Sequence, residues 1–452
     1  MSTGEALADQ TQRRIEEETR QRLRSTEAPV YTPSPQPVID YGGWQDIRYI
    51  DFHDDDKDSR AADSVDYMTW LDTRFWLKAT LKPALAEEDA PAREYALYVR
   101  LKNWYTQGIP KETAGGSDND GPHLDYAYVS LQIHPAWLRI GRHYFSVGQG
   151  LSYADVDDGV SLSLNLARMR LNGFWSRTLA HEDNIDTSVP GYDKASDRHF
   201  FGAECNYLGL AGNDLYAYAL FQRDFSDERP QDPAHNYAYQ SEYFGLGWRG
   251  KLKDTFSYWW ESVRETGKSY IYDTDSKRDV SAWAHIFALS YEPKVYTHPM
   301  LYFKYAYGSG DPDRSSVTDT FGGNSARGDK NFLYFGFIPA GYALAPQLSN
   351  LYFFKAGFSC RLLERNPFFK HLVSSLDYYR YYKDASRGGI YDPKASQNND
   401  DIGSEVDLTI NWQIFSDLAF SLQYGHFMPG KAYPSFSDSS EDYLSLSTSI
   451  SF

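Results

Sequence analysis

The chain has 452 residues with 45 basic and 62 acidic side chains, and the resulting net charge of −17 argues against a general nucleic-acid-binding protein. Two cysteines, Cys205 and Cys360, are too few for a disulfide framework, and we expect no bond between them. No run of about 18 apolar residues is present, which excludes a transmembrane helix. Aromatic residues nevertheless make up 16% of the chain, too large a share for a disordered protein.

The low mean hydropathy of −0.59 and the high aromatic content are compatible in a transmembrane β-barrel. Only every second residue of a transmembrane strand must face lipid, so the other half can be polar. Tyr and Trp suit the two membrane interfaces, because their rings have one apolar and one polar end. Composition therefore favours an all-β chain that forms an antiparallel barrel in the bacterial outer membrane.

Residues 1–40 form a predicted periplasmic extension. A polar, charge-rich helix is expected at about 5–24, where acidic and basic residues fall at the favourable i,i+4 spacing, and a Pro-rich tether follows. The extension is either weakly ordered or a helix that docks in or under the pore. Met1 is followed by polar residues instead of the apolar core of an export signal, so we expect a mature form behind an added start Met. The barrel is assigned to 41–452.

Alternating apolar and polar residues predict the strands. The alternation is clear at 160–166, 169–175, 405–414, 418–424 and 444–452, and the last segment ends on a C-terminal Phe, as the assembly signal of outer-membrane barrels does. Together the segments number about 18, an even count that suits a closed bacterial barrel. Further strands are expected to start near Trp44, Tyr67, Tyr95, Leu124, Trp137, His199, Leu215, Tyr239, Thr255, Val280, Met300, Leu348 and Phe369.

Connections between these strands alternate between short turns and long polar loops, as in outer-membrane barrels. The segment 83–93 departs from this rule, because it is long but falls on the side of the short turns. The longest loop, 309–347, contains the apolar stretch 332–340. A freely solvated loop has no use for so many aromatic residues, so we expect this one to fold over or into the mouth of the barrel.

Strand alternation also predicts which charged residues face the lumen, because a charge facing lipid at mid-membrane costs several kcal/mol. Such residues either select anions and bind carboxylates through guanidinium groups, or pair with one another and stiffen the wall. The predicted substrate-binding residues of the lumen are Arg74, Lys78, Arg100, Lys102, Arg139, Arg168, Arg170, Lys304 and Lys355, with the acids Glu204 and Asp377.

Signals for enzymatic chemistry are weak. The sequence has no nucleophile motif, P-loop or dinucleotide fingerprint, and His181 with its acidic neighbours lies in a polar loop. Asp311, Asp313 and Asp319 could contribute to a Ca²⁺ site, but their spacing does not match an EF-hand loop. We therefore expect neither catalysis nor a cofactor nor a metal.

Two stretches resemble the alginate-export family of outer-membrane porins. Residues 138–178 contain a Gly-Arg step followed by an Arg-bearing strand, and 305–359 contain a Gly-Asp loop followed by an Asn-containing strand. The resemblance implies a monomeric barrel of 18 strands that exports an anionic exopolysaccharide. It also places Arg139 and Arg168 in an electropositive constriction.

The predicted function is therefore an outer-membrane channel for a secreted exopolysaccharide such as an alginate-like polymer. Its expected partners are outer-membrane lipid, the polymer and periplasmic components of a secretion complex, with no nucleic acid. The sequence is also compatible with two alternatives. One is a diffusion porin for small anionic or sugar solutes, and the other is a barrel sleeve that houses a partner protein.

Overall fold

The computed structural model describes residues 38–53, 57, 67–81, 93–109, 117–179, 197–210, 212–225, 239–253, 255–271, 276–317, 323–325 and 328–452. The expected N-terminal helix, the His181 cluster and nearly all of 83–93 lie outside these residues. No helix of the described residues could cross a membrane. The first strand begins at Val38, and the proposed division of the chain at residue 40 stays a prediction.

The described residues form one antiparallel sheet of 18 strands, the number that the sequence predicts. The strands are β1 (Val38–His53), β2 (Tyr67–Leu81), β3 (Arg93–Ile109), β4 (Ser117–Ile133), β5 (Ala136–Ser146), β6 (Ala154–Leu166), β7 (Met169–Arg177), β8 (Arg198–Leu210), β9 (Asn213–Asp224), β10 (Gln240–Leu252), β11 (Phe256–Tyr270), β12 (Lys277–Tyr291), β13 (Met300–Gly308), β14 (Leu351–Cys360), β15 (Leu372–Tyr382), β16 (Asp401–Gln413), β17 (Leu418–Pro429) and β18 (Glu441–Ser451).

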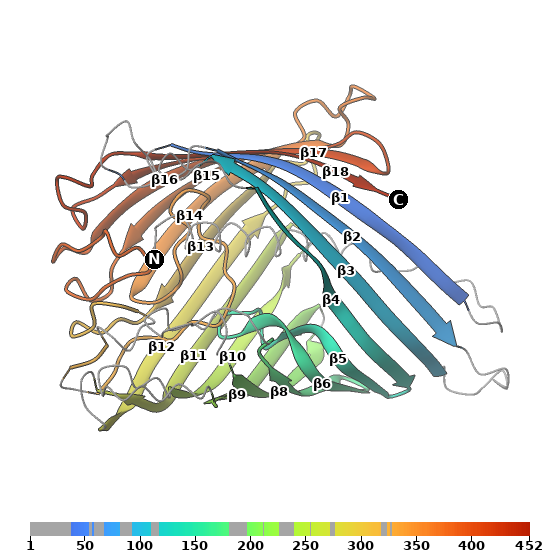
Figure 1. Ribbon diagram of the computed structural model, residues 1–452, viewed down its shortest axis with the longest axis horizontal. Helices are drawn as coiled ribbons and strands as arrows, with labels where there is room; N and C mark the ends of the chain where they lie inside the picture. Colours follow the sequence, from blue (N-terminus) through green and yellow to red (C-terminus); the bar gives the residue numbers. More distant parts are fainter. Residues whose placement is uncertain are drawn as a thin grey trace.

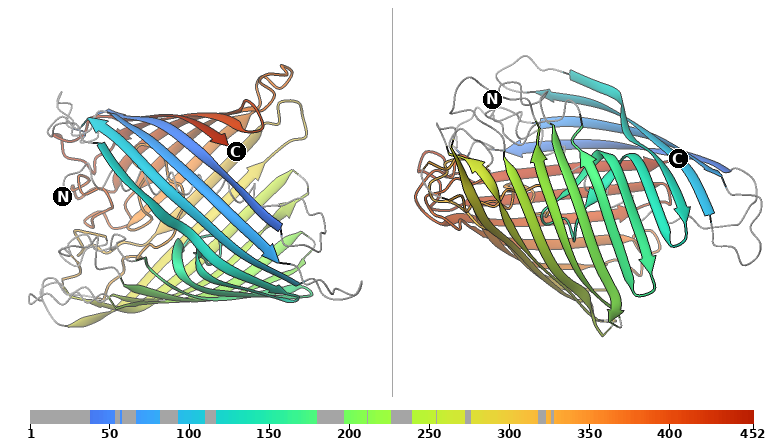
Figure 2. Two further views of the ribbon diagram at one scale, coloured as in Figure 1. Left: turned by 45° about the vertical axis from the view of Figure 1, so that its right-hand side comes forward. Right: turned by 90° about the horizontal axis from the view of Figure 1, so that it is seen from below.

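The sheet closes on itself, because each strand pairs with the next and β18 pairs with β1 (Figures 1 and 2). At the seam, Trp44 lies opposite Ser451, and Gly43 and Phe452 exchange two backbone hydrogen bonds of 2.9 and 3.0 Å. A closed barrel leaves no strand edge unpaired, which is a requirement for a sheet within lipid. Both cysteines are free, as the sequence predicts.

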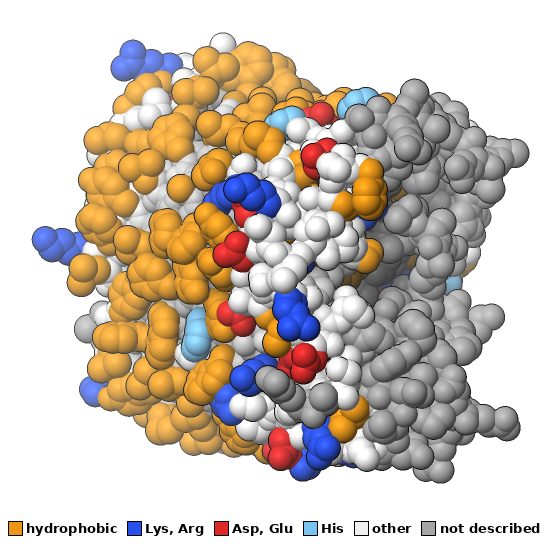
Figure 3. Space-filling view, turned by 90° about the vertical axis from the view of Figure 1, so that its left-hand side faces the viewer, with side chains coloured by type: hydrophobic (Ala, Val, Ile, Leu, Met, Phe, Trp, Pro, Cys, Tyr) orange, Lys and Arg blue, Asp and Glu red, His pale blue; other side chains and the backbone are white. Residues whose placement is uncertain are grey.

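The two faces of the sheet differ as the alternation predicts. On β2, Arg74 is 2% exposed, whereas its neighbour Phe75 is 45% exposed. On β3, Arg100 and Leu101 show the same contrast at 1% and 41%. Figure 3 shows the outer face as a broad hydrophobic surface that borders a band of charged side chains. Polar residues thus line the interior and apolar residues face the membrane.

Connection lengths give the barrel its orientation. Short turns join β4 to β5 at 134–135, β6 to β7 at 167–168 and β16 to β17 at 414–417. Long connections lie at the opposite end, such as 309–350 between β13 and β14 and 383–400 between β15 and β16. Short turns are periplasmic and long loops extracellular in barrels of this class. Both ends of each strand can therefore be assigned to a side of the membrane.

Candidate functional site in the lumen

Residues 328–350 fold into the barrel and cross its lumen near the extracellular ends of the strands. The ring of Phe335 lies 5.1 Å from that of Phe200 on β8. Further along the segment, Tyr342 stacks on Tyr443 of β18 at 6.0 Å between centroids. Because β8 and β18 lie on opposite sides of the closed sheet, the segment spans the interior. The infolding expected for the apolar stretch 332–340 is confirmed.

Buried carboxylates of the wall hold this segment in place. Glu405 on β16 accepts the backbone N–H groups of Tyr342, Ala343 and Leu344 at 2.6, 2.7 and 3.1 Å. Five strands away in the sheet, Glu265 of β11 accepts the backbone N–H of Leu333 at 2.9 Å. A buried N–H group left without an acceptor costs about 1–3 kcal/mol, and these acids supply the acceptors. These two acids therefore anchor the segment.

A second infolded segment, 147–153, is held in the same way. Glu204 on β8 accepts the backbone N–H of Gly148 at 2.6 Å, and Glu261 on β11 accepts that of Gln149 at 2.9 Å. The two segments are joined by the N–H of Phe337, which donates to the carbonyl of Gly150 at 2.8 Å. Glu204, a predicted substrate-binding residue, thus has a structural contact that the sequence does not reveal.

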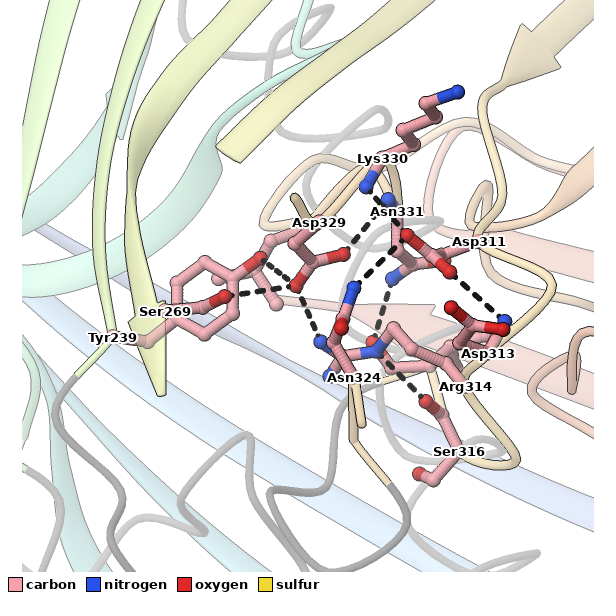
Figure 4. Close-up of polar contacts among 12 residues, drawn as sticks. Tyr239, Ser269, Asp311, Asp313, Arg314, Ser316, Asn324, Asp329, Lys330 and Asn331 are labelled. Carbon is pink, nitrogen blue, oxygen red and sulfur yellow. Dashed lines mark hydrogen bonds and ion pairs between the residues drawn. The ribbon is translucent and has the colours of Figure 1, made fainter. Parts of the chain in front are cut away.

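A polar network fixes the base of the long loop (Figure 4). Asp311 accepts the backbone N–H groups of Asp313 and Lys330, both at 2.9 Å, and the side-chain amide of Asn324 at 3.1 Å. Because N–H donors surround the Asp311 carboxylate, it is not arranged to bind a cation. The described residues contain no group of His, Cys, Asp and Glu that could hold a metal ion, and Asp319 lies outside them.

Several predicted lumen cations pair with carboxylates. Arg74 contacts Asp72 through hydrogen bonds of 2.7–3.1 Å and Asp125 at 3.0 Å. Arg100 donates from Nε to the same Asp125 at 2.5 Å, and its guanidinium lies 3.9 Å from the ring centroid of Tyr126. This buried cluster on β2–β4 therefore neutralises much of its own charge.

Two predicted lysines have one carboxylate each. Lys78 lies 3.6 Å from Glu94, and Lys355 lies 2.7 Å from Asp377, which is itself a predicted site residue. Lys102 lies over the ring of Trp104, with Nζ 4.1 Å from the centroid. The predicted alternative that wall charges pair with one another thus describes the contacts of Arg74, Arg100, Lys78 and Lys355.

Four other predicted cations have no carboxylate partner within the described residues. Lys304 on β13 lies opposite Lys355 in the strand register and makes no ion pair. Arg139 on β5 lies 3.8 Å from the ring centroid of Trp137, and its Nε has no hydrogen-bond partner. Arg170, at the start of β7, donates to Asn165 at 3.0 Å, whereas Arg168 is exposed in the β6–β7 turn.

The structure does not bring these cations together with the Arg74–Arg100 cluster. Arg139, Arg168 and Arg170 lie on β5, the β6–β7 turn and β7, close to the periplasmic turns. Asp125, which the sequence analysis missed, faces inward because the β3–β4 register shifts between Arg100 and Leu101. A regular alternation along β4 cannot reveal such a bulge.

Comparison with known proteins agrees with this architecture. A family model described as alginate export matches residues 88–447. The fold is similar to that of three Pseudomonas aeruginosa proteins: OpdK with vanillate (TM-score 0.58, 11% identity, covering 92% of this chain and 98% of that chain), OccK5, also called OpdH (0.56, 9%, 92% and 98%), and the outer membrane protein OprD (0.50, 10%, 91% and 94%). At these identities the likeness concerns the fold alone. No curated protein matches the sequence.

Proposed function

This chain belongs to the alginate export family and is an outer-membrane channel, and we propose that its cargo is an anionic exopolysaccharide such as an alginate-like polymer. The proposal depends on one observation, the position of the cations that lack a carboxylate partner within the described residues. Arg139, Arg168 and Arg170 lie toward the periplasmic end, where a polymer made inside the cell would enter the lumen. Lys304 lies at the middle of its strand, Met300–Gly308.

Cations without a carboxylate partner attract a polyanion to the entrance. Because the contacts are several and separate, the polymer can pass from one to the next along the lumen. Guanidinium groups bind sugar carboxylates, and no single site has to hold the chain tightly. Arg139 is flanked by the rings of Trp137 and Tyr128, so a sugar residue beside it would meet apolar as well as charged surface. The channel is passive in this proposal, with the driving force supplied by periplasmic components of a secretion complex.

The infolded segments narrow the extracellular exit of the lumen in this proposal. Residues 147–153 and 328–350 enter the lumen from the extracellular side and are tied to four buried or partly buried glutamates of the wall. Those acids are engaged by backbone N–H groups, which reduces the repulsion that a passing polyanion would meet. A narrow lumen suits a single extended chain. It offers little room for a folded partner, so the sleeve interpretation loses support.

The same narrowing also supports a second candidate, a diffusion porin for small anionic or sugar solutes. OpdK, a structural relative, was solved with vanillate, a small carboxylate, although the likeness extends only to the fold. The two candidates differ in how a long polyanion behaves. A polymer channel admits the polyanion, so longer oligomers should block its conductance more strongly. In a porin for small solutes, block should not depend on the length of the oligomer.

Planar-bilayer recordings with the full chain test the proposal. We expect a small, anion-selective conductance that alginate oligomers block from the periplasmic side, with block that strengthens as the oligomers lengthen. Replacement of Arg139 and Lys304 by Gln should weaken the block. Cation selectivity, or no block by any oligomer, would overturn the proposal. Block by monomeric uronate that equals block by oligomers would favour the small-solute porin.

A further inference from the structure

The outward-facing side chains of β11 and β12 mark the extracellular edge of the hydrocarbon layer. Along β11 they change from the exposed Trp260 to Ser262 and Arg264, and along β12 they change from Trp283 to Ser281 toward the extracellular end. Inward-facing neighbours such as Glu261 and Glu265 are fully buried. Aromatic rings at such a level belong to the interfacial girdle of a transmembrane barrel.

A groove lies on the outer face at this level. Its lining consists of Trp283 and His285 on β12 with Tyr305 and Tyr307 on β13, and this open depression has a volume of about 370 Å³. The His285 ring stacks between Trp283 at 5.7 Å and Tyr307 at 5.6 Å. Nδ1 of His285 is hydrogen-bonded to Ser262 Oγ at 2.8 Å, which leaves Nε2 for a ligand.

Arg264 borders this groove and has no carboxylate partner among the residues that the structure describes. Its guanidinium lies 4.8 Å from the ring centroid of Trp283, and Nη2 donates to Ser281 Oγ at 2.6 Å. Other outward-facing arginines near the extracellular ends are neutralised. The pairs are Arg142–Asp158 at 2.9 Å, Arg177–Asp197 at 2.8 Å, Arg223–Glu242 at 2.9 Å and Arg380–Asp401 at 2.6 Å. Within the described residues, Arg264 thus differs from these four arginines in having no carboxylate partner.

We propose that the groove binds the phosphorylated sugar headgroup of an outer-leaflet glycolipid. The guanidinium of Arg264 matches a phosphate group in charge and in its forked donor geometry. Aromatic side chains provide apolar surface for a sugar ring, and Nε2 of His285 can bond a sugar hydroxyl or the phosphate. Outer-leaflet lipid is also what this surface faces in the membrane. The site lies outside the lumen and does not depend on the proposed cargo.

Native mass spectrometry of the full chain in detergent, with bis-phosphorylated lipid A as the probe, tests this proposal. We expect one retained lipid A molecule and about tenfold weaker retention by Arg264→Gln, the effect of losing one charge-assisted hydrogen bond. Arg264→Lys should restore part of the binding. Arg223→Gln is the matched control, because Arg223 faces outward but already pairs with Glu242.

Equal retention by Arg264→Gln and the unaltered chain would overturn the proposal, as would an equal loss in Arg223→Gln. Dephosphorylated lipid A should bind as weakly to the unaltered chain as bis-phosphorylated lipid A binds to Arg264→Gln. Phosphatidylglycerol, which has a phosphate but no sugar ring, tests whether the sugar contributes to binding. If it competes as well as lipid A, the groove recognises anionic lipids in general and the glycolipid assignment is wrong. Each variant's barrel is verified by its heat-modifiable migration in gel electrophoresis.

Discussion

The carboxylate of Glu405 on β16 accepts the backbone N–H of Tyr342 at 2.6 Å, and the next two amides of the chain bond to the same group. Three consecutive N–H groups on one buried acid are a strong local anchor, since the acid is 0% exposed and ionised acceptors form the stronger hydrogen bonds. On this side of the lumen, Glu405 therefore holds the crossing segment 328–350 together with Tyr381, whose hydroxyl donates to the carbonyl of Ala340 at 2.9 Å, and Thr409, whose hydroxyl is hydrogen-bonded to that of Tyr342 at 2.8 Å.

Glu405→Gln should loosen the crossing segment. The amide keeps the size of the side chain but removes its charge and one acceptor, and hydrogen bonds to charged groups contribute about 1.5–3 kcal/mol. We expect single-channel recordings to show larger or more frequently fluctuating conductance. Glu364→Gln is the control, because Glu364 accepts a turn amide, that of Thr297, at 3.2 Å. An unchanged conductance in Glu405→Gln would show that other contacts hold the segment.

Arg139 and Arg168 are predicted to set the anion preference of the periplasmic entrance. Neither has a carboxylate partner within the described residues, so replacing both with Glu changes the local field without leaving a partner unpaired. We expect the anion-to-cation permeability ratio, measured from reversal potentials across a salt gradient, to fall severalfold or to invert. Among single variants, Arg139→Gln should lower the ratio more than Lys78→Gln, which removes a cation that already pairs with Glu94. Unchanged selectivity in the double variant would refute the role of both arginines.

The sequence predicts the strand number and both faces of the sheet because lipid and water impose opposite requirements on alternate residues. Alternation alone assigns the faces of the neighbours Arg74 and Phe75, since Arg74 is buried inside the barrel and Phe75 faces the membrane. The distinction between paired and unpaired cations is not predictable in this way. It depends on which carboxylate of a neighbouring strand comes within reach, as Asp377 does for Lys355 although its register partner is Gly357.

Alternation does not predict the orientation of two side chains of the site, those of Arg168 and Asp125. Strand alternation predicts that Arg168 faces the lumen, but Ala167 adopts a left-handed φ of 46° and the chain turns there, so parity no longer defines a direction. Asp125 faces inward only because of the register shift beside Arg100. The position of a turn or bulge depends on how a strand pairs with its neighbour. The alternation within one strand carries no information about that pairing.

Asp125→Asn should destabilise the barrel, because Arg100 would remain buried without its carboxylate. Removal of one member of a buried ion pair costs about 3–5 kcal/mol. We expect a lower urea midpoint for unfolding from lipid vesicles, followed by tryptophan fluorescence. The double variant Asp125→Asn/Arg100→Met should recover much of the loss, since Arg74 keeps Asp72. A double variant no more stable than Asp125→Asn would contradict this account of the cluster.

Lys57 links two extracellular segments, since its ammonium lies 3.2 Å from Asp392 and 2.9 Å from Glu441. Burial alone would raise the pKa of Asp392, but the charge of Lys57 outweighs it, so the pKa of Asp392 lies below its usual value of 3.8. The carboxyl is ionised more readily in the folded loop than in the unfolded chain. Its stabilising contribution is therefore complete above that usual value and is lost as the pH falls through the lower folded pKa. Lys57→Met removes the partner, and we expect the loop 383–400 to become more sensitive to added protease at pH 7. Equal cleavage of the variant and the unaltered chain would show that the ion pair does not hold the loop.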